Sequence, residues 1–218
     1  EPIVRGEPDL PPVVEAVEPR RDTQVLKDET VYLEARASDD FGVRSVMLKY
    51  TISGRETHVP VLYKTDPKLP PEAEVTTGEK LDLAKLKVKD GDVIAYAFIA
   101  WDNRQPELQA ARSRVFFITI RPDLEEAKKQ ESEGKGEQAK VDLSALIAEL
   151  KRLIRLSWDQ LDARGTEQDA LRAELYRGLK DLSVETSKKM NEVLKAAGGK
   201  GASEIREAFE AVDHEILR

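Results

Sequence analysis

The sequence contains no cysteine, which excludes disulfide bonds, thiolate nucleophiles and cysteine zinc sites. Its only two histidines, His58 and His214, fall in regions with different periodicity, so we do not expect them to share a site. No apolar run approaches the roughly 20 residues that cross a bilayer. The chain does not begin with Met and shows no signal-peptide pattern. We therefore interpret it as a piece of a larger protein whose membrane anchor or targeting signal lies outside it.

The sequence also lacks any clustered basic segment. Its 35 basic and 42 acidic side chains are interleaved and give a net charge of −7. Binding to a phosphate backbone needs a concentrated basic surface, so we expect no nucleic-acid partner. No nucleophile elbow, dinucleotide-binding motif or phosphate loop is present either. We therefore expect a protein that is not an enzyme, with a hydrolase as the least favoured reading.

Proline is absent from the last 96 residues, because all 11 prolines lie at or before Pro122. Nine of the 12 aromatic residues lie in the same first part. Proline is tolerated in loops and at the edges of sheets but excluded from the interiors of long helices. The composition therefore predicts an α+β multidomain protein, with a β domain first and an all-α part after residue 122.

The first part, residues 11–121, breaks into short apolar runs separated by turn residues. Period-two alternation, typical of a half-buried strand, is clear in residues 30–37 and 46–52. Turn residues occupy 38–42 and 53–55, and a proline-bearing polar stretch predicts a long loop before Leu81 and Leu83. Further strands are expected near residues 13–17, 57–63, 81–83, 93–101 and 114–120. About seven short strands with regular turns predict an antiparallel β-sandwich.

One stretch in this part resembles a known family. Leu86, a turn at Gly91, and Tyr96 at the start of a strand that ends in Ala-Trp-Asp resemble the E–F corner of fibronectin type III and related immunoglobulin-like domains. The resemblance implies an immunoglobulin-like antiparallel β-sandwich, with Leu86 and Tyr96 as structural residues and the Tyr96 hydroxyl bonded back across the corner. No core Trp stands on the third strand, so an antibody-type domain is not expected.

The second part has a helical period. We interpret residues 122–141 as a charged linker, part of which could be helical, and residues 1–10 as an N-terminal extension. Apolar residues then recur every three or four positions, which predicts helices at about 142–163, 167–197 and 203–217. Short joints favour antiparallel neighbours. A helical hairpin, a three-helix bundle and helices paired across a dimer all remain open.

The candidate site residues are Asp39, Asp40, Asp102 and Asn103. In an immunoglobulin-like sandwich the two loops that carry them lie at the same end. Three carboxylates and an amide there would suit Ca²⁺, which takes about six to eight oxygen ligands. The alternative is that each Asp caps its own turn through local backbone bonds. Trp101 could offer an aromatic surface to a glycan or pack inward. No other cofactor is expected.

The order of parts carries a second resemblance. Ala-Ser-Asp-Asp-Phe-Gly-Val at residues 37–43, Ala-Trp-Asp-Asn at 100–103, and a last strand running into charged helices resemble the extracytoplasmic region of large membrane-anchored bacterial proteins of uncharacterised function. The resemblance implies a periplasmic or cell-envelope location and a non-catalytic role.

The sequence thus favours a non-enzymatic interaction or structural spacer module. It would meet a protein partner or associate with itself through its helices, and reach a membrane only through a segment outside this chain. The alternative is a calcium- or glycan-binding β-sandwich module that uses the loop end with Asp39, Asp40, Asp102 and Asn103.

Overall fold

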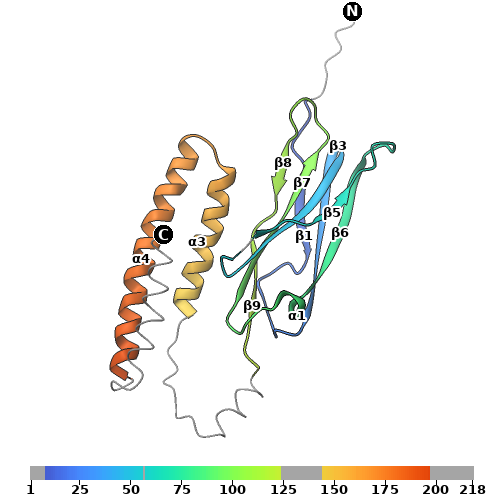
Figure 1. The fold of residues 1–218 in the computed structure, drawn as a ribbon. Coiled ribbons are helices and arrows are strands. Elements are labelled where there is room, and N and C mark those ends of the chain that lie inside the picture. Colours follow the sequence, from blue (N-terminus) through green and yellow to red (C-terminus); the bar gives the residue numbers. More distant parts are fainter. Residues whose placement is uncertain (1–7, 56, 124–143, 197–218) are drawn as a thin grey trace, which may run out of the picture. The chain divides into compact units, whose positions relative to one another are not determined.

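The computed structural model describes residues 8–55, 57–123 and 144–196 (Figure 1). The protein is α+β: a large curled sheet is followed by a helical part. The chain divides into two compact units, Glu1–Lys128 and Lys129–Arg218, called here the β unit and the helical unit. Within the described ranges, no helix is both long enough and apolar enough to cross a membrane.

The described part of the β unit contains a nine-stranded sheet and one short helix. In chain order its elements are β1 (Val13–Glu18), β2 (Thr23–Val25), β3 (Thr30–Ile52), β4 (Thr57–His58), β5 (Val61–Lys64), β6 (Glu72–Asp82), α1 (Leu83–Leu86), β7 (Val93–Asp102), β8 (Ala110–Arg112) and β9 (Phe116–Ile120).

The long strand β3 organises the sheet, because its two parts pair with different neighbours. Residues 30–38 are flanked by β1 and β6, whereas residues 43–52 are flanked by β7 on one side and by β4 and β5 on the other. β7 then pairs with β8 and β9, and β2 lies beside β9. Among the described strands only the β2–β9 pair is parallel, so the sheet is mixed, and it curls where β3 changes neighbours.

The turn predicted at residues 38–42 is a bend within β3. The pairing register shifts between Ser38 and Val43 against β6, and directly after the bend, between Val43 and Ser45, against β7. Before the bend the buried positions are odd-numbered, from Val31 to Asp39, and beyond it they are even-numbered, from Val46 to Ile52. A strand keeps one phase unless extra residues are inserted, so the bend acts as a bulge that re-aims the buried face.

Glycine is required at the bend. Gly42 has φ +111°, a conformation that residues with a Cβ rarely adopt. A Cβ at this position would also overlap the ring of Pro71, which immediately precedes β6. The β3 bend and the loop between β5 and β6 therefore lie in close contact.

Tyr96 is fully buried in the core of the β unit, and burial raises the pKa of its hydroxyl. This hydroxyl donates to the carbonyl of Pro19 at 3.3 Å, in the segment between β1 and β2. The partner therefore differs from the one that the resemblance implied, which lay just upstream of β7. Leu86 ends α1 and packs half-buried against the core.

Several strand predictions were wrong in their bounds. Most of the predicted long loop is β6, and Leu83 begins α1 instead of completing a strand. β6 buries only Val75 and Leu81, so its polar edge gives almost no alternating signal. The predicted strand at residues 57–63 is broken at Pro60, whose carbonyl accepts from the Leu48 N–H at 3.0 Å. The short strands β2 and β8 were not predicted.

In the helical unit, α3 (Ser144–Asp162) and α4 (Thr166–Ala196) form an antiparallel hairpin within a residue or two of the predicted bounds. Leu153, Leu156 and Leu182 are its most buried leucines. Gly178 on α4 permits a close approach, because a Cβ there would overlap Leu153. The predicted helix at 203–217 and nearly all of the linker at 122–141 lie outside the described residues.

We expect Gly42→Ala to lower the free energy of unfolding of the β unit by about 2–4 kcal/mol, because it adds both backbone strain and a clash. Gly54→Ala is the matched control: its φ is also positive, at +70°, but no atom lies within 4 Å of the added Cβ. It should cost about 1 kcal/mol. Urea unfolding followed by Trp101 fluorescence, in a Trp158→Phe background, measures both. Equal costs would contradict the close approach at Pro71.

A candidate cation site at one end of the β unit

Two aspartates are buried because strand alternation places them on the inward face. In β3, Asp39 follows the inward-facing run Val31, Leu33, Ala35 and Ala37. In β7, Asp102 follows the inward-facing run Ile94, Tyr96, Phe98 and Ala100. Successive side chains of a strand alternate between faces, so both carboxylates are carried into the end of the core. Asp39 is 8% exposed and Asp102 is 0% exposed.

The loop between β7 and β8 closes around Asp102. Its Oδ1 accepts from the backbone N–H of Gln109 at 2.7 Å and from that of Arg104 at 3.3 Å. The Asp102 N–H in turn donates to the Gln109 carbonyl at 3.1 Å. Asp102 Oδ2 is buried and has no hydrogen-bond partner among the described residues. One oxygen of this carboxylate is therefore hydrogen-bonded by its own loop, and the other is not.

Asp39 shows the same division. Its Oδ2 accepts from the Phe41 N–H at 3.1 Å within the β3 bend, while its Oδ1 is buried with no partner in the described chain. Asn103 ties the bend to the β7–β8 loop, because its Nδ2 donates to the Phe41 carbonyl at 2.8 Å. The exposed Asp40 accepts from the Leu10 N–H at 3.4 Å.

Asp9 joins this cluster from the segment that precedes β1. Its Oδ1 is buried and lacks a hydrogen-bond partner among the described residues, and its carbonyl accepts from Gln109 Nε2 at 3.2 Å. One carboxylate oxygen from each of Asp9, Asp39 and Asp40 lies within 4.8 Å of the other two. The sequence had placed residues 1–10 in an extension and gave no periodic signal for Asp9.

Two members of the cluster, Asp39 and Asp9, resist ionisation. Burial raises the pKa of Asp39, the charges of Asp40 and Asp102 add to the rise, and backbone donors in the β3 bend oppose it. Burial also raises the pKa of Asp9, again with help from Asp102 and Asp40, while Arg104 acts in the opposite direction. The negative charges of Asp39 and Asp9 are therefore poorly solvated and lie near two further carboxylates, those of Asp40 and Asp102.

The geometry combines the two readings that the sequence left open. One oxygen of Asp39 and one of Asp102 cap their own turns, as the local reading expects. The second oxygen of each is buried without a partner, and so is one oxygen of Asp9. A buried carboxylate oxygen without a partner is costly, so such a group takes up a proton or meets a cation. An all-oxygen donor set suits a hard cation such as Ca²⁺.

The aromatic and histidine candidates do not join the cluster. Trp101 directly precedes Asp102 in β7, so its side chain lies on the opposite face of the strand, where it is half-buried. Its indole N–H has no hydrogen-bond partner among the described residues. His58 lies on β4, where its ring stacks on Tyr50 with 4.9 Å between centroids. His214 lies outside the described residues.

No protein-family model matches the chain, and no curated protein matches it in sequence. Among the solved structures with a slight likeness to the chain are the following three. The Br derivative of BhCBM56 is 10% identical, with a TM-score of 0.25 over 40% of this chain and 78% of that chain. AggA, the major subunit of aggregative adherence fimbriae type I from Escherichia coli, is 7% identical, with a TM-score of 0.30 over 50% of this chain and 94% of that chain. The sporulation control protein Spo0M from Bacillus subtilis is 12% identical, with a TM-score of 0.34 over 56% of this chain and 55% of that chain. Scores this low support no conclusion about function.

We expect Asp39→Asn to stabilise the chain at neutral pH when a chelator removes divalent cations, since it removes a buried, repelled charge. Because the pKa of Asp39 is raised above its ordinary 3.8, the folded state binds its proton more tightly than the unfolded state does. Its ionisation therefore costs stability as the pH rises through the raised pKa. The advantage of Asn should be largest near pH 7 and should fade as the pH falls toward 4.

Urea midpoints measured in chelator across this pH range test the expectation. Asp28→Asn, an exposed change in the turn between β2 and β3, is the control and should shift the midpoint little at any pH. An Asp39→Asn variant that is less stable than the parent in chelator at neutral pH would show that the carboxylate is not under electrostatic strain.

Proposed function

We propose that the β unit is a non-enzymatic Ca²⁺-binding module. Two observations carry the proposal: one carboxylate oxygen each of Asp9, Asp39 and Asp102 is buried without a hydrogen-bond partner among the described residues, and carboxylate oxygens of Asp9, Asp39 and Asp40 lie within 4.8 Å of one another. The carboxylate of Asp40 lies beside two of them. A divalent cation would neutralise this cluster and supply the missing partners.

The donor set favours Ca²⁺ over Mg²⁺. The four carboxylates come from three separate segments, and Asn103 is held nearby by its bond to the β3 bend. Ca²⁺ accepts about six to eight oxygens in a flexible arrangement, whereas Mg²⁺ demands near-ideal octahedral geometry and retains its waters. The exposure of Asp40 leaves the solvent side of such an ion open to water or to another ligand.

Binding would join segments that are remote in sequence. The segment around Asp9 is otherwise attached to this end by two long hydrogen bonds, of 3.4 Å from the Leu10 N–H and 3.2 Å to the Asp9 carbonyl. A cation shared with β3 and β7 would hold the segment firmly, which suits a spacer or interaction module. Weak sites of this kind work where Ca²⁺ is abundant, with a Kd of about 0.1–1 mM in extracellular modules. We therefore propose that the module works outside the cytoplasm.

We also infer that the β unit is an immunoglobulin-like sandwich. The division of β3 supports this, because its first part pairs with β1 and β6 and its second part with β5 and β7. Two sets of strands joined by one bent strand would enclose a core between two layers. The burial of Leu33 and Leu48, one from each part of β3, fits such a core.

Isothermal titration calorimetry of the chelator-treated chain tests the proposal. We expect one Ca²⁺ per chain, with a Kd of about 0.1–1 mM, and a higher melting temperature in Ca²⁺ because the ion binds only the folded state. The double variant Asp39→Asn/Asp102→Asn should lose both the heat and the shift.

The control is Asp28→Asn/Asp90→Asn, which removes the same charge from two exposed aspartates at the other end of the unit. It should bind Ca²⁺ as the parent does. The proposal is refuted if the parent shows neither heat nor a change in melting temperature at about 10 mM Ca²⁺, a concentration well above any Kd that suits an extracellular module.

A further inference from the structure

The end of the β unit that carries the acidic cluster also exposes large apolar side chains on four separate segments. Leu10 is 59% exposed, Phe41 49%, Leu69 64% and Leu108 36%. They lie respectively on the segment before β1, the β3 bend, the loop between β5 and β6 (residues 65–71) and the β7–β8 loop (residues 103–109). Three of them are sequence neighbours of residues in the cluster or of the Gln109 that bonds to it.

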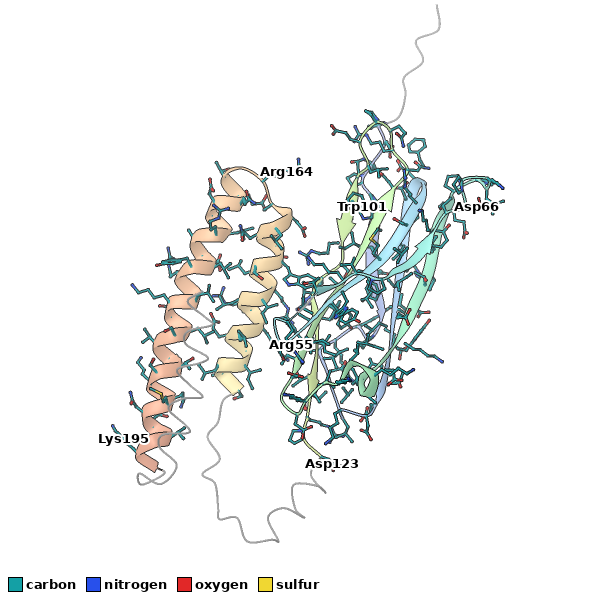
Figure 2. All side chains as sticks on the ribbon, in the orientation of Figure 1. Arg55, Asp66, Trp101, Asp123, Arg164 and Lys195 are labelled. Atoms are coloured by element: carbon teal, nitrogen blue, oxygen red, sulfur yellow. The ribbon has the colours of Figure 1, made fainter. Side chains whose placement is uncertain are left out.

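The contacts between these segments place them together. The bend meets the N-terminal segment through the Leu10 N–H and meets the β7–β8 loop through Asn103. The β5–β6 loop meets the bend at Gly42 and Pro71, and the Thr65 N–H donates to the Arg44 carbonyl at 2.9 Å. In Figure 2 the labels of Asp66 and Trp101 mark this end of the β unit, and those of Arg55 and Asp123 lie toward the other.

The opposite end of the unit has a different surface. Its turns are formed by residues 26–29, 53–55 and 83–92, and none of their described large apolar residues is exposed. Scattered apolar side chains are normal on a protein surface, but one on every segment around a single site is not random scatter. The apolar loop tips therefore belong to the acidic end alone.

The acidic end also presents basic side chains. Arg44, Lys64, Lys68 and Arg104 are all exposed on the same segments or directly beside them, together with three exposed acidic residues, Asp66, Glu72 and Glu107. With the cluster unoccupied, its carboxylates oppose any anionic surface. With Ca²⁺ bound, two of the four carboxylate charges are offset, and the basic residues and the open side of the ion face outward. Apolar tips, exposed cations and an accessible divalent ion together match a surface where anionic oxygens lie directly above hydrocarbon.

We propose that the acidic end docks on an anionic lipid bilayer when Ca²⁺ is bound. The proposal rests on the calcium site proposed above. Phosphate oxygens of the headgroups complete the ion's coordination on the Asp40 side, and Leu10, Phe41 and Leu69 enter the boundary between headgroups and acyl chains. The exposed basic residues add attraction to the anionic surface, which weakens at high salt.

Flotation of the full chain with lipid vesicles tests the docking. The vesicles contain either phosphatidylcholine alone or phosphatidylcholine with phosphatidylglycerol, and each is used in Ca²⁺ and in chelator. We expect binding only to the phosphatidylglycerol vesicles and only in Ca²⁺. The triple variant Leu10→Ser/Phe41→Ser/Leu69→Ser should lower the partition coefficient about tenfold or more, because it removes the buried apolar surface.

The matched control is Val13→Ser/Tyr32→Ser/Val61→Ser, which changes three exposed apolar residues on strands and should bind like the parent. Calorimetry of the loop-tip triple variant should still show one bound Ca²⁺, which separates this proposal from the calcium site itself. The docking is overturned if the parent binds Ca²⁺ but not the vesicles, if both triple variants lose binding equally, or if binding persists in chelator. Absence of Ca²⁺ binding by the parent would instead overturn the site.

Discussion

The acidic end of the β unit depends on one electrostatic constraint. Burial and the charges of Asp40 and Asp102 oppose the ionisation of Asp9 and Asp39, whose pKa values are raised. Moving a charge out of water costs roughly several kcal/mol unless a partner compensates it. Protons can neutralise such a cluster at low pH, and we propose that a cation does so near neutral pH. The N-terminal segment, the β3 bend and the β7–β8 loop meet around these carboxylates.

The constraint arises from ordinary strand periodicity. The residues that fill the core alternate along β3 and β7, and the next position in each series is an aspartate. Ala37 and Ala100 precede these aspartates on the same faces, so the inward side chains are small just before the carboxylates. The backbone then turns away, and the Gly42 bend and the β7–β8 loop supply N–H groups to one oxygen of each carboxylate. The other oxygens remain available for a ligand.

Much of this could be predicted from the sequence. Proline placement and the change of periodicity predicted a β part followed by a helical part, and the turns expected at one end of the sheet suggested Asp39, Asp40, Asp102 and Asn103 as candidate ligands. Extending the alternation of residues 31–37 by one step would also have predicted the burial of Asp39. The contribution of Asp9 could not be predicted, because it depends on where a segment without regular structure meets β3 and β7. The strand β6 was missed because an edge strand with polar residues lacks the pattern that signals burial.

The central claim is that a cation, and not a shared proton, balances the cluster. A crystal structure of the chain grown in Ca²⁺, with anomalous scattering used to identify the ion, tests it most directly. The account predicts one Ca²⁺ bound by Asp39 Oδ1, Asp102 Oδ2 and Asp9 at about 2.3–2.6 Å, with Asp40 or water on its open side. An ion-free cluster at millimolar Ca²⁺ and neutral pH, with carboxyl groups hydrogen-bonded directly to one another, would contradict it.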